Sequence, residues 1–437
     1  MKPGFYTIMA AQFFSSLADN ALLIAAIALL REMHSPDWMT PMLKLFFVIS
    51  YVVLAAFVGA FADSRPKGQV MTITNLIKIF GCIVMFFGGH PLVAYGIVGF
   101  GAAAYSPAKY GILTELLPPE KLVAANGWIE GTTVSSIILG VVFGGLLISP
   151  RVSDTLLAFD FPFVDTGVDT PAEAAIAVIM VSYLVATIFN FRIPDTGARY
   201  PKQQTRVLRL ISDFWHCNRV LWNDKLGQIS LAVTTLFWGA GSTLQFIVLK
   251  WAERALGMNL SQASTLQAVI ALGIAGGAVT AAGRVPLRRS LTVLPFGIAM
   301  GVLVVLLAFY HRDTVPEGFV TLGRVQLSYA MLCACALLIV VGGLAGYFVV
   351  PMNALLQHRG HVLMSAGHSI AVQNFNENIG VLTMLFVYAL LVYLNLPVPV
   401  VIVLFGTFVS LIMVFIIKRH RANQRDFDSV SLIPEGH

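Results

Sequence analysis

Ionisable side chains inside long apolar runs are the residues of this sequence that are best placed to do chemistry. Asp19 and Asn20 stand within the run FFSSLADNALL, and Ser15 and Ser16 fall one turn away on the same face of a helix. A carboxylate at membrane depth is costly and is therefore a functional candidate. We expect Asp19 and Asn20 to take part in substrate binding or gating; a structural hydrogen bond from Asp19 to a neighbouring helix is the alternative.

A second polar cluster lies in a later apolar run, where the sequence reads QNFNEN over residues 373–378. Packing between membrane helices rarely requires so many amides, so we expect Asn374 and Glu377 to line a polar cavity. Glu130 holds the related place in an earlier run, LVAANGWIEG. Gln245, within FWGAGSTLQF, either adds one polar group to the same cavity or serves plain helix packing.

Two lysines, Lys78 and Lys109, also lie within apolar runs. Long lysine side chains can reach back to the membrane surface, so both a functional and a structural role stay open for Lys78. Glu130 either acts in the cavity or pairs with one of these lysines. Lys109 either contacts a phosphate group or marks the membrane edge. The functional role is favoured for Lys109, because Pro107 interrupts the helical hydrogen bonds beside it and exposes polar backbone groups.

A short motif of small, acidic and basic residues reads GAFADSRPKGQVM at 59–71. In it Asp63 is followed by Arg65 and Lys67, at the expected cytoplasmic end of a helix. The motif resembles the loop 2–3 signature of the major facilitator superfamily, and this resemblance implies that the three residues act in gating without touching the substrate. The alternative is that the two bases only fix membrane topology. A weaker copy of the motif, GRVPLRR at 283–289, lacks the acid.

The composition indicates which elements must hold these residues in place. Of the 437 residues, 57% are hydrophobic and only 11% are charged, which excludes a soluble domain of this size. A membrane-spanning helix needs roughly 20 mostly apolar residues, and the chain contains about twelve such runs. We expect an all-α integral membrane protein with spans at 5–30, 42–62, 70–88, 92–112, 122–148, 172–191, 226–249, 262–283, 291–310, 325–350, 367–394 and 397–417.

The placement of basic residues predicts the orientation of these spans. If both termini are cytoplasmic, about nineteen Lys and Arg residues fall in inner loops and about seven fall in outer loops. Cytoplasmic loops of membrane proteins carry such an excess of Lys and Arg. We therefore expect both termini to be cytoplasmic. The expected parts are an N-terminal six-helix half at 1–191, a cytoplasmic linker at 192–225, a C-terminal six-helix half at 226–417 and a cytoplasmic tail at 418–437.

The linker contains apolar residues at helical spacing, from Val207 to Trp215, with charged residues on the other faces. This pattern predicts an amphipathic helix on the inner membrane surface; docking of a protein partner is the alternative.

An internal repeat supports the division into halves. The stretch from Gly101 to Gly131 returns in altered form over residues 343–378, with Tyr105 matching Tyr347. A polar loop between membrane-length segments, repeated at half the chain length, is typical of a two-half transporter.

Seven segments together closely resemble the bacterial lysophospholipid transporter family of the major facilitator superfamily: FFSSLADNALL, GAFADSRPKGQVM, GAAAYSPAKYGIL, LVAANGWIEGT, FWGAGSTL, VVPMNALLQHRG and SIAVQNFNEN. The resemblance runs through nearly the whole chain. It implies the major facilitator fold, with two pseudo-symmetric halves of six transmembrane helices. One position departs from the family pattern, which has an arginine where this chain has Gln245. Lys78, Lys109 or another base would then have to supply that cation.

The resemblance implies that lysophosphatidylethanolamine and lysophosphatidylglycerol move from the outer to the inner leaflet of the bacterial inner membrane. There a separate acyltransferase/acyl-carrier-protein synthetase would restore the second acyl chain. We expect no enzyme activity, no cofactor and no nucleic-acid partner. Our hypothesis is that the head group enters a polar cavity, with Asp19 or Glu377 facing an ammonium group and a lysine facing the phosphate. The two halves would rock around it.

The nearest alternative is a facilitator-type exporter of amphipathic drugs or other small solutes, which would share the fold; a channel-like scramblase is a third. A membrane acyltransferase needs a histidine and an acid, often as His-x-x-x-x-Asp, and none of the nine histidines has that spacing. His358 and His361 form His-x-x-His in an expected inner loop. No third ligand is evident in the sequence, so we expect no metal site.

Overall fold

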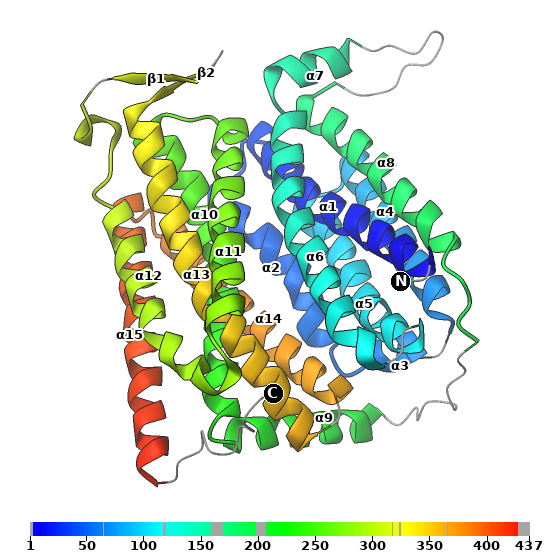
Figure 1. Cartoon of the computed structure of the whole chain (residues 1–437). Coiled ribbons are helices and arrows are strands. Elements are labelled where there is room, and N and C mark those ends of the chain that lie inside the picture. The colour runs from blue at the N-terminus through cyan, green and yellow to red at the C-terminus, as the bar shows by residue number, and fades with distance from the viewer. Residues whose placement is uncertain are drawn as a thin grey trace. The chain divides into compact units, whose positions relative to one another are not determined.

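The computed structural model describes residues 3–63, 65–116, 119–158, 169–197, 207–316, 318–322, 325–364 and 366–426 (Figure 1). The chain packs as two compact units, Met1–Ile211 and Ser212–His437. Because residues 427–437 lie outside the described residues, most of the predicted tail is not seen, although the last helix continues to Asp426.

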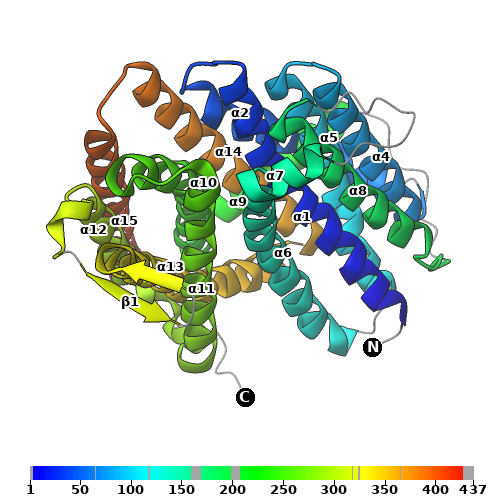
Figure 2. The ribbon, with the colours of Figure 1, turned by 90° about the horizontal axis from the view of Figure 1, so that it is seen from above.

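The N-terminal unit is a bundle of helices arranged around α1. Figure 2 shows α1 between α6 and α8, and α1 packs against both. Its polar residues therefore face the interior of the unit. The helices are α1 (Pro3–Glu32), α2 (Met39–Val53), α3 (Val58–Asp63), α4 (Lys67–Phe86), α5 (Pro91–Leu116), α6 (Pro119–Leu147), α7 (Pro150–Leu157) and α8 (Pro171–Phe191). The next helix, α9 (Val207–Asn223), belongs to the C-terminal unit from Ser212 onward.

The C-terminal unit contains longer helices with well-defined ends. Gly257 adopts a left-handed backbone conformation with φ 66° just after α10. Asn259 and Gln262 form a capping box at the start of α11. The elements are α10 (Gly227–Leu256), α11 (Leu260–Arg284), η1 (Leu287–Val293), α12 (Leu294–Leu307), η2 (Arg312–Thr314), β1 (Phe319–Leu322), β2 (Val325–Ser328), α13 (Tyr329–Leu363), α14 (Ala366–Tyr393) and α15 (Val398–Asp426).

The helices agree with the predicted all-α class. All twelve predicted spans overlap a helix, the second of them the pair α2 and α3. Within the described residues, nine helices are long and apolar enough to cross a membrane by themselves. A tenth is the pair α6 and α7, which is bent by 64°. The 15-residue α2 is shorter than a full span and continues after a turn as α3.

Two details of the sequence prediction were wrong. The span expected to start at residue 325 begins as strand β2, which pairs with β1 in an antiparallel hairpin before α13 starts at Tyr329. The short strand runs directly into an apolar helix without a marked break in hydropathy, which explains the error. His358 and His361 lie on α13 and not in a loop, because this helix has 35 residues. Pro107 lies inside α5, which continues to Leu116, and its predicted effect on the hydrogen bonds beside it stays a prediction.

Close helix packing in the C-terminal unit depends on glycine. Helices α11 and α13 lie side by side (Figures 1 and 2). A Cβ atom at Gly273 or Gly277 of α11 would overlap the backbone of α13, and one at Gly342 or Gly346 of α13 would overlap α11. Small residues at such positions let membrane helices approach closely.

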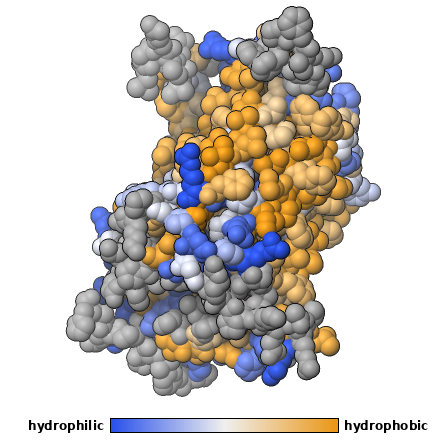
Figure 3. Space-filling model, turned by 90° about the vertical axis from the view of Figure 1, so that its right-hand side faces the viewer, coloured by the Kyte–Doolittle hydropathy of each residue, from blue (hydrophilic) through white to orange (hydrophobic). Residues whose placement is uncertain are grey.

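One face of the N-terminal unit has the character of a lipid-facing surface. Figure 3 shows a broad hydrophobic area on the side of the molecule that carries α4 and α8. Large apolar side chains project outward from both helices at helical spacing. They are Leu76, Phe80, Ile83 and Phe87 beside α4, and Val181, Leu184, Ile188 and Phe191 on α8. Such a surface is stable only in lipid or under a partner.

Candidate binding site in the N-terminal unit

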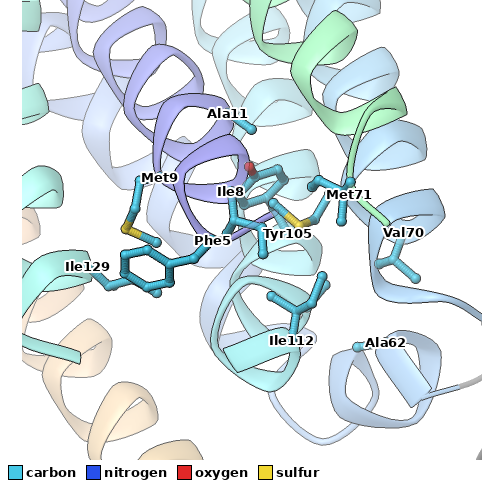
Figure 4. Close-up of a cluster of buried hydrophobic side chains, with 12 residues drawn as sticks. Phe5, Ile8, Met9, Ala11, Ala62, Val70, Met71, Tyr105, Ile112 and Ile129 are labelled. Atoms are coloured by element: carbon cyan, nitrogen blue, oxygen red, sulfur yellow. The ribbon is translucent and has the colours of Figure 1, made fainter. Parts of the chain in front are cut away.

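A cluster of buried apolar side chains lies beside the site. Phe5, Ile8 and Met9 of α1 pack with Met71 of α4 and Tyr105 of α5 (Figure 4). Tyr105 is the member of this cluster that carries a polar group at its tip, and its ring also lines the pocket described below. The cluster therefore fixes the backbone of three helices next to the polar residues.

An ion pair joins Asp19 of α1 to Lys78 of α4. The distance from Lys78 Nζ to Asp19 Oδ2 is 2.8 Å, and the side chains are 2% and 13% exposed for Lys78 and Asp19. Lys78 Nζ also donates to Ser15 Oγ at 2.9 Å. Lys78 therefore does not reach back to the membrane surface, which was one of its predicted alternatives.

Two tyrosines complete the surroundings of Asp19. The Tyr183 hydroxyl of α8 donates to Asp19 Oδ1 at 2.6 Å, and the Tyr95 hydroxyl of α5 donates to the Asp19 backbone oxygen at 2.9 Å. Both carboxylate oxygens of Asp19 thus have partners within the chain. A substrate ammonium group would have to compete with Lys78 for this carboxylate.

A pocket of about 180 Å³ opens beside this ion pair. It brings together four of the predicted residues, Asp19, Asn20, Lys78 and Lys109. Asn20 uses its amide to donate to the Ser16 backbone oxygen at 2.8 Å, one turn back on α1. The pocket walls come from α1, α2, α4, α5 and α6, so the site is assembled from distant parts of the N-terminal unit.

A separate hydrogen-bonded chain holds Lys109. Its Nζ donates to Thr133 Oγ1 at 3.4 Å, and Thr133 Oγ1 donates to Gln12 Oε1 at 3.2 Å. Gln12 Nε2 donates in turn to Thr132 Oγ1. Lys109 therefore lies at the level of Gln12, about two turns along α1 from Asp19. The pocket therefore has one lysine in each of these two hydrogen-bonded networks, Lys78 in the first and Lys109 in the second.

Sequence reasoning missed several residues of this pocket. Lys44 of α2 lines it, with Nζ 5.5 Å from the centroid of the Phe47 ring. Gln12, Tyr95 and Tyr183 also belong to the polar network. Lys44 stands inside an apolar run, as Lys78 and Lys109 do, and the same criterion would have found it. The tyrosines gave no such signal, because tyrosine is common in any membrane helix.

Four predicted residues are not placed with this group. The Glu130 side chain lies outside the described residues. Gln245, Asn374 and Glu377 belong to the C-terminal unit. Glu377 accepts a hydrogen bond from Gln373 Nε2 at 2.8 Å, while the backbone oxygens of Asn374 and Gln245 accept from amide side chains. Their role in a cavity stays a prediction.

Part of the amide cluster of α14 holds α9. Asn376 Nδ2 donates to Asn218 Oδ1 at 2.7 Å, and Trp222 Nε1 donates to Asn376 Oδ1 at 3.0 Å. Phe214 and Trp215 of α9 pack edge-on against the Phe375 ring of α14. Some of the apolar face assigned to the membrane surface is therefore covered by protein, and one of the amides serves this contact.

The three predicted gating residues are only partly described. Asp63 is the last residue of α3, and its side chain lies outside the described residues. Arg65 is exposed. Lys67 is buried, donates to the Ala62 backbone oxygen at 2.9 Å, and has Nζ 3.8 Å from Glu115 Oε1. Lys67 thus ties the end of α3 to the end of α5, and its gating role stays a prediction.

A bidentate ion pair joins Arg359, near the end of α13, to Asp224, which lies outside the candidate spans in the segment before α10. Arg359 donates to both carboxylate oxygens of Asp224, at 3.0 and 2.6 Å. Burial alone would raise the pKa of Asp224, but the hydrogen bonds from Arg359 and from the Gly227 backbone N–H outweigh it and hold that pKa below its usual value.

This pair predicts a loss of stability in acid. Because the pKa of Asp224 is lower in the folded state, its contribution is complete above about pH 4 and is lost as the pH falls through the lower, folded-state value. The thermal unfolding midpoint in detergent should therefore fall below about pH 4 by more in wild type than in Asp224→Asn. Equal acid sensitivity in both proteins would contradict this role of Asp224.

Comparisons with known proteins agree with this architecture. The sequence profile of the Major Facilitator Superfamily matches residues 8–384. An auto-inhibited peptide transporter of the POT family has a similar structure, with a TM-score of 0.67 at 12% identity over 96% of this chain and 97% of that one. A bacterial homologue of the human lysosomal transporter Spinster, inward-facing and unoccupied, gives a TM-score of 0.64 at 15% identity over 98% and 99%. The fold is that of a major facilitator transporter.

The sequence relatives are more specific. The lysophospholipid transporter LplT of Yersinia enterocolitica is 41% identical over 399 residues, covering 91% of this chain and 89% of that protein. The protein of the same name from Cronobacter sakazakii is 40% identical over 396 residues, covering 90% of each. The chain belongs to the lysophospholipid transporter family within the Major Facilitator Superfamily, and it is a transporter and not an enzyme.

Proposed function

We propose that this protein moves lysophospholipids from the outer to the inner leaflet of the bacterial inner membrane, with both termini in the cytoplasm. A separate acyltransferase/acyl-carrier-protein synthetase would then restore the second acyl chain. Relatives named lysophospholipid transporter, at about two-fifths identity over most of the chain, support the substrate class. The observation that carries the proposal is the pocket of the N-terminal unit, with cations inside an otherwise apolar bundle.

The ion pair within the pocket assigns different tasks to the lysines. Lys78 is held by Asp19 and Ser15, so it neutralises the carboxylate and fixes α4 against α1. Lys109 also lines the pocket, and its Nζ donates to Thr133 Oγ1 at 3.4 Å, a longer contact than those that Lys78 makes with Asp19 and Ser15. We assign the substrate phosphate to Lys109, because a hydrogen bond between a cation and a phosphate is stronger than one between a cation and a neutral hydroxyl.

The chemistry of a lysolipid suits such a site. Its charged head group cannot cross hydrocarbon without partners, because an unpaired charge in an apolar medium is very costly. Its single acyl chain needs no protein partner, since membrane lipid is equally apolar. A polar pocket inside a helical bundle therefore has to recognise only the head group. Asp19, Asn20 and Lys109 would form that contact in the N-terminal unit.

The proposal is tested by uptake and reacylation of labelled lysophosphatidylethanolamine. Spheroplasts that lack their own transporter but keep the acyltransferase would express this protein or carry an empty vector. We expect labelled diacyl lipid only with the protein, and a fall of about tenfold or more for Lys109→Gln because the phosphate loses a charged partner.

The control variant is Lys250→Gln, in which the lost lysine lies near the end of α10 and pairs with Glu253 at 3.8 Å. It should transport as wild type does. If inserted wild-type protein produced no diacyl lipid, the proposal would be wrong and a small-solute exporter would become the better reading.

A further inference from the structure

The hydroxyl of Tyr105 differs from the two tyrosine hydroxyls that contact Asp19. Tyr95 and Tyr183 both donate to Asp19. Tyr105 is 5% exposed, and its hydroxyl is buried without a hydrogen-bond partner among the described residues. Buried polar groups in native proteins nearly always have a partner, so an exception requires an explanation.

The position of this hydroxyl points to a ligand. Tyr105 lines the pocket together with Lys109, which is one turn further along α5 and so lies on the same face of the helix. Figure 4 shows the Tyr105 ring within the apolar cluster, with its oxygen on the side away from Ile112. The cluster fixes the ring, so the hydroxyl cannot turn away to find another partner.

The charge around the ring favours an anionic ligand atom. Lys78 Nζ, which is paired with Asp19, lies 5.1 Å from the centroid of the Tyr105 ring, and Lys109 lines the same pocket one turn further along α5. Cations near a phenol favour a hydrogen bond in which the hydroxyl donates to an anion. A neutral ligand oxygen would gain less from the same position.

We propose that the Tyr105 hydroxyl donates a hydrogen bond to a phosphate oxygen of the bound monoacyl phospholipid, beside Lys109. This inference rests on the proposed function and adds a determinant of specificity to it. A monoacylglycerol has the same chain and glycerol but no phosphate. It would leave the Tyr105 hydroxyl without an acceptor, and a site built to hydrogen-bond one group rejects an analogue that lacks it.

The test is Tyr105→Phe, which removes only the oxygen. Purified full-length protein would be titrated with lysophosphatidylglycerol and with the monoacylglycerol of the same chain. We expect the variant to bind lysophosphatidylglycerol about 10- to 100-fold more weakly than wild type and monoacylglycerol equally well. The thermal midpoint of the ligand-free variant should be unchanged or raised, because an unpaired buried hydroxyl is removed.

The comparison variant is Tyr183→Phe, which removes the hydrogen bond to Asp19 Oδ1 and should lower the ligand-free thermal midpoint. If wild type binds lysophosphatidylglycerol and Tyr105→Phe binds it equally well, the hydroxyl contacts only water and the inference is overturned. A fall in the ligand-free midpoint of Tyr105→Phe to that of Tyr183→Phe would show a structural role and would also overturn it. Failure of wild type to bind any lysophospholipid would instead refute the proposed function.

Discussion

Asp19→Asn is expected to abolish lysophospholipid uptake while the protein still inserts into the membrane at normal levels. The substitution keeps the size of the side chain but removes the charge that holds Lys78 Nζ at 2.8 Å and accepts from Tyr183 at 2.6 Å. Breaking a buried ion pair from one side costs about 3–5 kcal/mol, because the other charge stays buried without compensation. Thermal unfolding in detergent and spheroplast uptake would measure the two effects separately.

The double variant Asp19→Asn/Lys78→Met separates stability from transport. Removing both charges leaves no uncompensated ion, so the free energy of unfolding should recover by about 2 kcal/mol or more relative to either single variant. Uptake should remain absent, because the pocket has lost the Asp19 carboxylate that would contact the head group. Near-wild-type uptake by Asp19→Asn would show that the carboxylate has neither a binding nor a gating role.

Gly277→Ala is expected to lower the free energy of unfolding by about 3 kcal/mol, with a large loss of folded protein in the membrane. The new Cβ would overlap the Gly343 carbonyl oxygen and approach the Tyr347 backbone nitrogen of α13. All the atoms that it meets belong to the backbone, so no side chain can turn aside. The two helices would have to separate along their length.

The control for this prediction is one residue away on α11. A Cβ at Gly276 meets no atom within 4 Å. Gly276→Ala should therefore leave the free energy of unfolding unchanged or raise it by up to about 1 kcal/mol, because alanine favours the helix more than glycine does. Equal losses for the two variants in a thermal shift measurement would mean that the loss in Gly277→Ala does not come from the contact with α13.

The fold could be predicted from the sequence because each membrane helix requires a long apolar run, which the sequence shows directly. A bilayer leaves no water for backbone groups, so each span must be a helix with a long apolar run. The predictions failed where this rule does not apply. One such place is the hairpin of β1 and β2, and another is the end of α13, which extends past the predicted span and includes His358 and His361.

The sequence by itself also determined the candidates for chemistry, because a charge in an apolar run is too costly to be retained without a use. Asp19, Lys78 and Lys109 were found in this way. Only the tertiary structure decided their partners. Asp19 and Lys78 are 59 residues apart, and Asp19 and Tyr183 are 164 apart. Hydrogen bonds depend on distances of about 3 Å between atoms, and helix packing sets those distances.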